Sequence, residues 1–197
     1  MRSPALRIAA VVVAIGLVVV VMVFPRTPSS VREKVVTTPL SEAERELEAA
    51  VQMVQSGQNP MEGIMKIRSL VEADSTFEDA HLWLGSFSLQ SGQRDKAEER
   101  FQTVIRLNPS NPEPYWQLAM MDIDEKDYTA AIPNLLRSVE LDSAYVNGLF
   151  FAARCYEEIG QPNEAMDLYE KYLPYAPDTV VEQRVKDFMM MIELNKK

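Results

Sequence analysis

The chain has 197 residues, 47% of them hydrophobic, which is enough for one folded domain with an appendage. After position 40 it carries 28 acidic and 15 basic residues, a net charge of −13. A surface of that sign repels phosphate backbones, so we expect no nucleic-acid partner. The single cysteine excludes an intramolecular disulfide.

Residues 1–24 are predicted to form an N-terminal transmembrane signal anchor. Residues 8–24 carry no charge, and the 20 residues between Pro4 and Pro25 span about 30 Å as a helix. One alternative is a cleaved signal peptide, but the segment does not end in the small-residue pattern of a cleavage site. The other is a buried core helix, but the segment is apolar on all sides rather than along one stripe.

The orientation of this anchor depends on the flanking charges, which are nearly balanced. Arg2 and Arg7 precede the span, whereas Arg26, Arg32 and Lys34 follow it. The positive-inside rule therefore gives almost no preference for either orientation. A very short tail with two arginines is typical of bacterial signal anchors, so we expect a single-pass membrane protein with a periplasmic or otherwise extracytoplasmic domain.

A flexible linker is predicted over residues 25–40, where prolines alternate with serines and threonines. Ser41 and Glu44 then have the spacing of a capping box, in which each side chain binds the backbone N–H of the other residue. The folded domain is therefore expected to start at this point and to cover residues 41–197.

Within the domain, the same residue types recur every 34 positions. The pattern is clearest at Leu84-Gly85, Ala97, Phe101 and Pro109, and again at Ala152-Ala153, Ala165, Tyr169 and Pro177. A small residue at the start of each second helix lets two helices approach closely, and a proline ends the second helix. A single hairpin of this kind cannot bury its apolar stripe, so successive hairpins must stack.

This pattern resembles the tetratricopeptide repeat (TPR). The resemblance implies an all-α fold, an α-solenoid of about four helical hairpins, preceded by the transmembrane helix. The units are placed at residues 44–77, 78–111, 112–145 and 146–179. A capping helix is expected at 178–195, with Asp178 at its N-terminus and apolar side chains at Val181, Val185, Phe188 and Ile192.

Two units depart from the family pattern. Gly63 stands where Ala is usual, and Ser56-Gly57 shifts the turn of the first unit by one position. The third unit lacks the terminal proline and carries Pro133 in its second helix. A proline is tolerated near a helix start, so we expect this helix to begin close to Ala130 or to bend.

Residues that could carry enzyme chemistry are scarce. His81 is the only histidine, which argues against a histidine-rich metal site and favours a packed interface residue. Cys155 is expected to be a buried thiol. No glycine-rich phosphate loop is present. We therefore expect neither catalysis nor a bound cofactor or metal.

The resemblance also implies a concave groove lined by the first helix of each hairpin, with a peptide-binding set at Leu82, Trp83, Ser86, Trp116, Gln117, Met120, Phe150, Phe151 and Arg154. These aromatic and aliphatic side chains suit an apolar or amphipathic peptide. The chaperone-binding members of the family instead hold acidic tails with a clamp of lysines, arginine and asparagines. Packing between repeats is the alternative role for the same residues.

The leading hypothesis is a membrane-anchored scaffold or adaptor that binds segments of envelope proteins. A chaperone-like holder of unfolded or translocating clients near the secretion machinery is the alternative. A third is a cytoplasm-facing receptor, similar in layout to organelle import receptors. The sequence leaves homo-oligomerisation open and does not name the partner.

Overall fold

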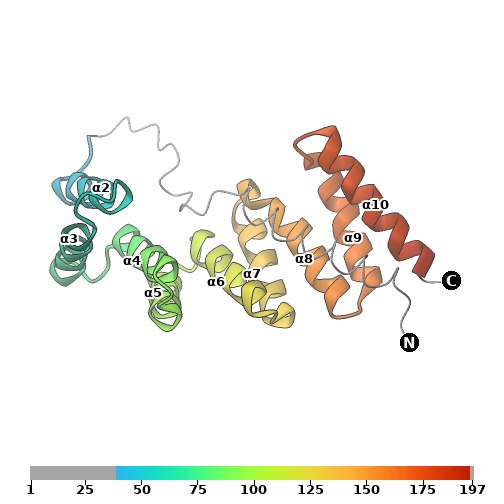
Figure 1. Cartoon of the computed structure of the whole chain (residues 1–197), viewed down its shortest axis with the longest axis horizontal. Helices are drawn as coiled ribbons and strands as arrows, with labels where there is room; N and C mark the ends of the chain where they lie inside the picture. Colours follow the sequence, from blue (N-terminus) through green and yellow to red (C-terminus); the bar gives the residue numbers. More distant parts are fainter. Residues whose placement is uncertain (1–38, 196–197) are drawn as a thin grey trace.

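The computed structural model describes residues 39–195, and every regular element in this range is helical. The helices follow one another in a row as antiparallel pairs (Figure 1). The predicted anchor at 1–24 and nearly all of the linker at 25–40 lie outside the described residues. Among the helices of residues 39–195, none has the length and apolar character needed to cross a bilayer.

Four helical hairpins and a final helix make up this array. Their helices are α2 (Glu42–Gln55) with α3 (Pro60–Ala73), α4 (Glu78–Gln90) with α5 (Arg94–Leu107), α6 (Glu113–Glu125) with α7 (Tyr128–Leu141), α8 (Asn147–Glu158) with α9 (Pro162–Tyr172), and α10 (Thr179–Asn195). Short 3-10 helices, η2 (Ser143–Tyr145) and η3 (Leu173–Tyr175), follow α7 and α9.

The helix starts follow from local capping chemistry. Ser41 and Glu44 form the expected capping box at α2, with the Ser41 N–H donating to Glu44 Oε2 at 2.8 Å. The Asp178 carboxylate accepts from the N–H groups of Val180 and Val181, and so caps α10. Asp127 caps α7 in the same way, through Ala130 N–H.

The cap at Asp127 sets the start of the third unit's second helix. The Asp127 carboxylate binds the Ala130 N–H, and α7 begins at Tyr128, two residues before Ala130 and close to the expected start. Pro133 consequently lies inside the helix, where it removes one backbone donor.

The turns inside the hairpins need one residue in the left-handed region. Gly57, Gly92 and Gly160 take this conformation, with φ between +69° and +74°. In the third hairpin Lys126 occupies the same place, with φ of +66°. A lysine is strained there, because its Cβ crowds the following carbonyl.

Close contact inside each hairpin depends on the small residue that recurs in the second helix. Gly63, Ala97, Ala131 and Ala165 are all buried, as the sequence predicts. A Cβ on Gly63 would lie 2.5 Å from the Ala50 carbonyl oxygen, so this position has no room even for alanine.

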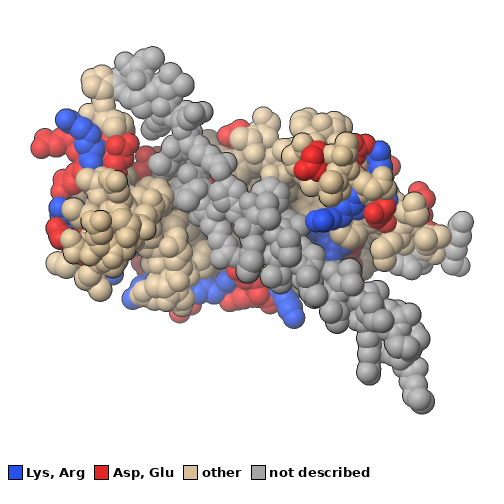
Figure 2. Space-filling view, turned by 45° about the horizontal axis from the view of Figure 1, so that its top comes forward, with Lys and Arg blue, Asp and Glu red and all other residues tan. Residues whose placement is uncertain are grey.

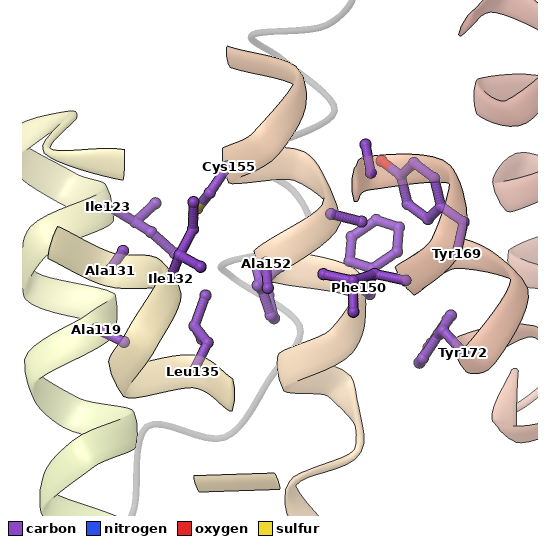
Figure 3. Packing of buried hydrophobic residues seen from close by; sticks show 14 of the residues in the cluster. Ala119, Ile123, Ala131, Ile132, Leu135, Phe150, Ala152, Cys155, Tyr169 and Tyr172 are labelled. Atoms are coloured by element: carbon purple, nitrogen blue, oxygen red, sulfur yellow. The ribbon is translucent and has the colours of Figure 1, made fainter. Parts of the chain in front are cut away.

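The buried apolar residues form three clusters along the array. One joins α2, α3 and α4 around Ile67 and Trp83, and a second joins α4, α5 and α6 around Phe101. The third is the largest and runs from α6 to α10 (Figure 3). In α10 Val185 and Ile192 are buried, and Val181 and Phe188 pack against the same cluster, as expected for a capping helix.

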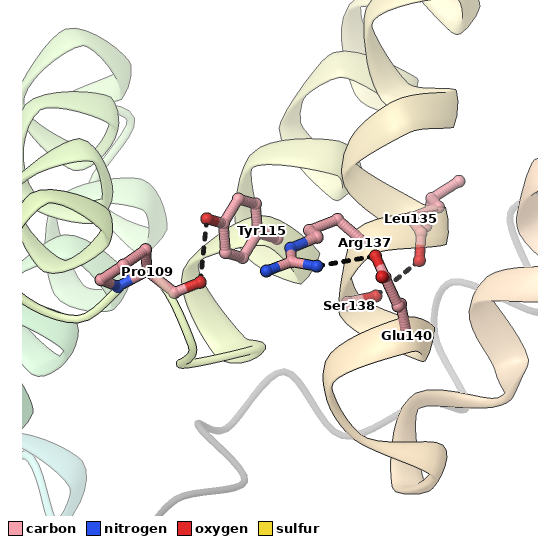
Figure 4. Close-up of polar contacts among 6 residues, drawn as sticks. All are labelled: Pro109, Tyr115, Leu135, Arg137, Ser138 and Glu140. Atoms are coloured by element: carbon pink, nitrogen blue, oxygen red, sulfur yellow. Dashed lines mark hydrogen bonds and ion pairs between the residues drawn. The ribbon is translucent and has the colours of Figure 1, made fainter.

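One polar contact fixes the connection between the second and third hairpins, and two others lie within α7. The Tyr115 hydroxyl on α6 donates to the Pro109 carbonyl at 3.2 Å, and Arg137 on α7 pairs with Glu140 (Figure 4). The buried Ser138 hydroxyl donates to the Leu135 carbonyl at 2.7 Å. The chain entering α6 is therefore fixed to the preceding loop.

Candidate protein-binding groove

The nine residues of the predicted groove lie on the first helices α4, α6 and α8, but most of them are packed inside the array. Only Trp116 and Met120 are partly exposed. The other seven are buried: Leu82, Trp83, Ser86, Gln117, Phe150, Phe151 and Arg154. At these helix positions the side chains meet the neighbouring hairpin, which removes them from the surface.

Trp116 belongs to an aromatic group between α6 and α8. Its ring meets that of Phe151 edge-on at 5.6 Å between centroids, and that of Tyr145 at 5.8 Å. Phe151 in turn contacts Phe150 at 5.7 Å. Such edge-to-face pairs fix the rings relative to one another, so Trp116 presents a rigid apolar surface.

A buried polar network, which the sequence did not reveal, adjoins this group through Tyr145. Glu113 is only 2% exposed, and its carboxylate accepts from Gln117 Nε2 at 2.7 Å and from the Tyr145 hydroxyl. Asn111 Oδ1 accepts from the Glu113 N–H at 3.1 Å. A carboxylate in a first helical turn is usually solvated, so nothing in the sequence marked Glu113 as buried.

Arg154 on α8 ties the last three helices together. Its guanidinium pairs with Glu157 and with Glu158, the latter at 3.8 Å, and lies 4.6 Å from the ring centroid of Phe188 on α10. Burial raises the pKa of the Glu157 carboxyl, and Arg154 opposes that rise. The buried Tyr169 hydroxyl lies beside this pair without a hydrogen bond of regular geometry. Arg154 is therefore a structural residue of the C-terminal end.

The three predicted residues of α4 are not brought into the aromatic group. Trp83 stacks on Phe87 at 5.4 Å within the cluster of α2, α3 and α4, whereas Leu82 belongs to the cluster of α4, α5 and α6. The Ser86 hydroxyl is buried without a hydrogen-bond partner among residues 39–195. The structure thus joins the α6 and α8 residues and leaves those of α4 apart.

His81 and Cys155, the two candidates for reactive chemistry, are both engaged in packing. Burial, together with the nearby Arg100 and Arg106, lowers the pKa of His81. Burial raises the pKa of the Cys155 thiol to about 12, so the thiol stays protonated at neutral pH. Within residues 39–195 no group of three His, Cys, Asp or Glu side chains is arranged to hold a metal.

Charged side chains are distributed unevenly over the surface. In the view of Figure 2, acidic side chains are seen at both ends of the array and along its lower edge, each time beside basic side chains.

Known proteins share both the repeat and the stacking. Family models described as tetratricopeptide repeat match residues 78–111 and 122–187, which together make up half of the chain. The chain belongs to the tetratricopeptide repeat family. The bounds of the first match are those of the second predicted unit.

Solved TPR-like structures show the same fold at low identity. A crystal structure of MamA superposes with a TM-score of 0.65 at 19% identity, covering 80% of this chain and 84% of that one. The N-terminal domain of stress-induced protein-1 from C. elegans gives 0.53 at 19% identity, with 56% and 93% covered. These matches establish the architecture of the TPR array.

A curated relative also matches part of the chain. The human antiviral innate immune response effector IFIT1 is 25% identical, over 58% of this chain and 30% of its own length. The TPR chain thus spans less than a third of that relative.

Proposed function

We propose that the chain is a membrane-anchored scaffold whose TPR array binds apolar or amphipathic peptide segments of envelope proteins. The observation that carries this proposal is the half-buried Trp116, backed by Phe151 and Tyr145. Met120 lies one helical turn further along α6 and is also partly exposed. Together they offer an apolar surface on a rigid support.

The chemistry of these two side chains fits peptide capture. Tryptophan is the side chain most often found as an energetic anchor at interfaces, and methionine adapts to varied apolar partners. Amphipathic segments bind such grooves through apolar residues one turn apart. In this proposal the buried Phe151 supports the site, and the other buried members of the predicted set do not touch the partner.

The test is capture by the immobilised full-length chain from solubilised membranes, with Met120→Glu as the main variant. A carboxylate at this partly exposed position should abolish capture, and Trp116→Ala should abolish it as well; circular dichroism checks that both variants stay folded. Lys171→Glu, on the exposed side of α9, is the control for added negative charge. Retention of the same partner by Met120→Glu and Trp116→Ala would rule out this surface.

The proposed organisation places the anchor at residues 1–24, the linker at 25–40 and the repeat domain at 41–197, with the domain on the extracytoplasmic side. The uncharged run of residues 8–24 supports the anchor. A reporter enzyme fused after Lys197, active on one side of the membrane only, tests the orientation. Activity restricted to the cytoplasm would reverse it.

A chaperone-like holder is the second candidate. It is favoured by the apolar side chains that α10 exposes near its end, Met190, Met191 and Leu194. Exposed methionines suit many unrelated clients. A holder should delay light scattering by several unfolded proteins at equimolar ratio, and replacing the three residues by serine should remove that effect. A scaffold should retain one or two partners instead.

A further inference from the structure

A cavity of about 240 Å³ lies at the junction of α3, α4 and α5, and its lining residues are Arg68, Leu84, Ser88, Lys96, Glu99 and Arg100. On α4, Leu84 and Ser88 follow the predicted groove residues Leu82 and Ser86 by two positions, which is about 200° around a helix. The cavity therefore opens on the opposite side of α4 from these groove residues, between the second helices of two hairpins.

The cavity is basic although the chain is acidic. Three cationic side chains and one carboxylate line it, a net charge of +2 in a chain of net charge −9. Within the described part of the chain, these cations take part in no ion pair. Lys96 Nζ donates to the Gln93 side-chain oxygen at 2.6 Å, and Arg68 makes no hydrogen bond or ion pair with any residue of the range 39–195. By contrast, the ion-paired cations lie elsewhere: Lys66, Arg94, Arg137, Arg154 and Lys186.

A neutral histidine positions the third cation. Arg100 Nη1 lies 3.2 Å from His81 Nδ1, and His81 Nε2 lies 3.1 Å from the Ser75 carbonyl oxygen. An imidazole protonated at Nε2 alone satisfies both contacts, because it donates to Ser75 and accepts from Arg100. His81 thereby orients the guanidinium without neutralising its charge.

An apolar surface adjoins the cavity. Met61 and Met65 are 71% and 61% exposed on α3, and they precede Arg68 by seven and three residues. This spacing places the three side chains on one face of the helix. A ligand that reaches Arg68 can therefore also cover two exposed methionines.

We propose that this cavity binds an acidic peptide segment of a partner protein, with an Asp or Glu side chain between Arg68, Lys96 and Arg100 and an apolar neighbour on Met61 and Met65. Arginine pairs with a carboxylate through two parallel hydrogen bonds. A peptide brings few charges, whereas nucleic acid or an anionic bilayer would bring many against a negative domain. The site is separate from Trp116 and Met120, so either proposal can fail alone.

Fluorescence anisotropy with the full-length chain in non-ionic detergent tests the proposal. The probe is a labelled, C-terminally amidated peptide of alternating Glu and Leu, and its control has Gln in place of Glu. Only the Glu peptide should bind. Arg68→Glu should lower the affinity for this peptide at least about tenfold, because Glu at position 68 repels the peptide carboxylate that Arg68 would pair with. Arg68 is exposed, so the variant should keep its helical circular dichroism.

Lys171→Glu makes the same change of charge on α9 and should affect the affinity far less. Three results would overturn the proposal. Equal affinity for the Gln peptide would show that the carboxylate plays no part in binding. Equal losses of affinity in Arg68→Glu and Lys171→Glu would show that binding depends only on the overall charge of the chain. Displacement of the peptide by millimolar inorganic phosphate at constant ionic strength would make the cavity a phosphate site instead.

Discussion

The two halves of the TPR array are built from the same repeat but packed differently. From α6 to α10 one cluster of buried residues is continuous, because Phe150 contacts Phe151, Tyr169, Tyr172 and Phe188 across three helices. From α2 to α6 the buried residues fall into two smaller clusters, which share only α4.

This difference shows that a regular sequence repeat does not guarantee equally strong packing between all successive hairpins. The stability of a solenoid is a sum of repeat and interface contributions, and large aromatic residues that cross an interface strengthen it locally. The continuous half supports Trp116, and the divided half carries the basic cavity. The rigid aromatic support and the boundary between two separate clusters therefore lie in different parts of one array.

The largest effect is expected from Phe150→Ala. Removing a buried phenylalanine that joins three helices should lower the free energy of unfolding by about 3–5 kcal/mol. The chain has two tryptophans, and Trp116 lies in the C-terminal cluster whereas Trp83 lies in the first one. Urea unfolding followed in Trp83→Phe and in Trp116→Phe backgrounds separates the two halves.

In this experiment the transition seen by Trp116 should move to lower urea much further than the one seen by Trp83. Phe101→Ala, in the cluster of α4, α5 and α6, serves as the matched variant. If Phe150→Ala shifted both tryptophan transitions equally, the array would unfold as one unit and the difference between the halves would have no energetic meaning.

A smaller loss is expected from Gly63→Ala in the first hairpin. Alanine gains about 1 kcal/mol of helix propensity over glycine, but the new Cβ would lie 2.5 Å from the Ala50 carbonyl and 2.6 Å from Val54 Cγ2. We expect a net destabilisation of about 1–3 kcal/mol, as for other overpacked sites. Thermal unfolding measures it, with Ser69→Ala on the exposed side of α3 as the control. A higher stability of Gly63→Ala would show that α2 and α3 can move apart without a cost in free energy.

Lys126→Gly should stabilise the third hairpin by about 1 kcal/mol, because it removes a side chain from the left-handed conformation. The reverse exchange, Gly92→Lys in the second hairpin, should destabilise by a similar amount. Both values follow from urea unfolding of the full-length chain. An unchanged free energy of unfolding in Lys126→Gly would mean that the lysine makes interactions that compensate for the strain.

The pH dependence should differ in sign between the halves. Burial lowers the pKa of His81, so protonation favours the unfolded state and the first two hairpins should lose stability as pH falls below about 6.5. Burial raises the pKa values of Glu157 and Asp122, so as pH rises these carboxyls lose their protons at a lower pH in the unfolded state than in the folded state. The C-terminal half should therefore lose stability as pH rises above about 4.3.

Single-tryptophan unfolding across this pH range measures both slopes. His81→Gln should flatten the slope seen by Trp83, and Glu157→Gln the slope seen by Trp116. Identical slopes for the two tryptophans in the parent chain would contradict the assignment of these groups to separate halves.

Much of the architecture could be predicted from the 34-residue period, because the period reports which residues face a neighbour. The capping box at Ser41, the cap at Asp178 and the close approach at Ala97, Ala131 and Ala165 are local features of this kind. The sequence also marked Gly63 as irregular, and the short distance to Ala50 explains why alanine is absent there.

The site was less predictable, because a helical period does not state how near the next helix lies. Trp83 and Trp116 were assigned to the same groove, but only Trp116 is partly exposed. The basic cavity could not be seen in the sequence at all, since Arg68 is far along the chain from Lys96 and Arg100. Packing of the hairpins alone brings these cations together.

The central claim, that the apolar surface of α6 holds a partner segment, is tested most directly by photo-crosslinking in living cells. A benzophenone amino acid is placed at position 120 in the full-length chain, and at Lys171 on α9 for comparison. We expect a discrete adduct from position 120, absent from position 171 and lost when Trp116→Ala is added. Equal adducts from both positions, or an adduct that survives Trp116→Ala, would contradict it.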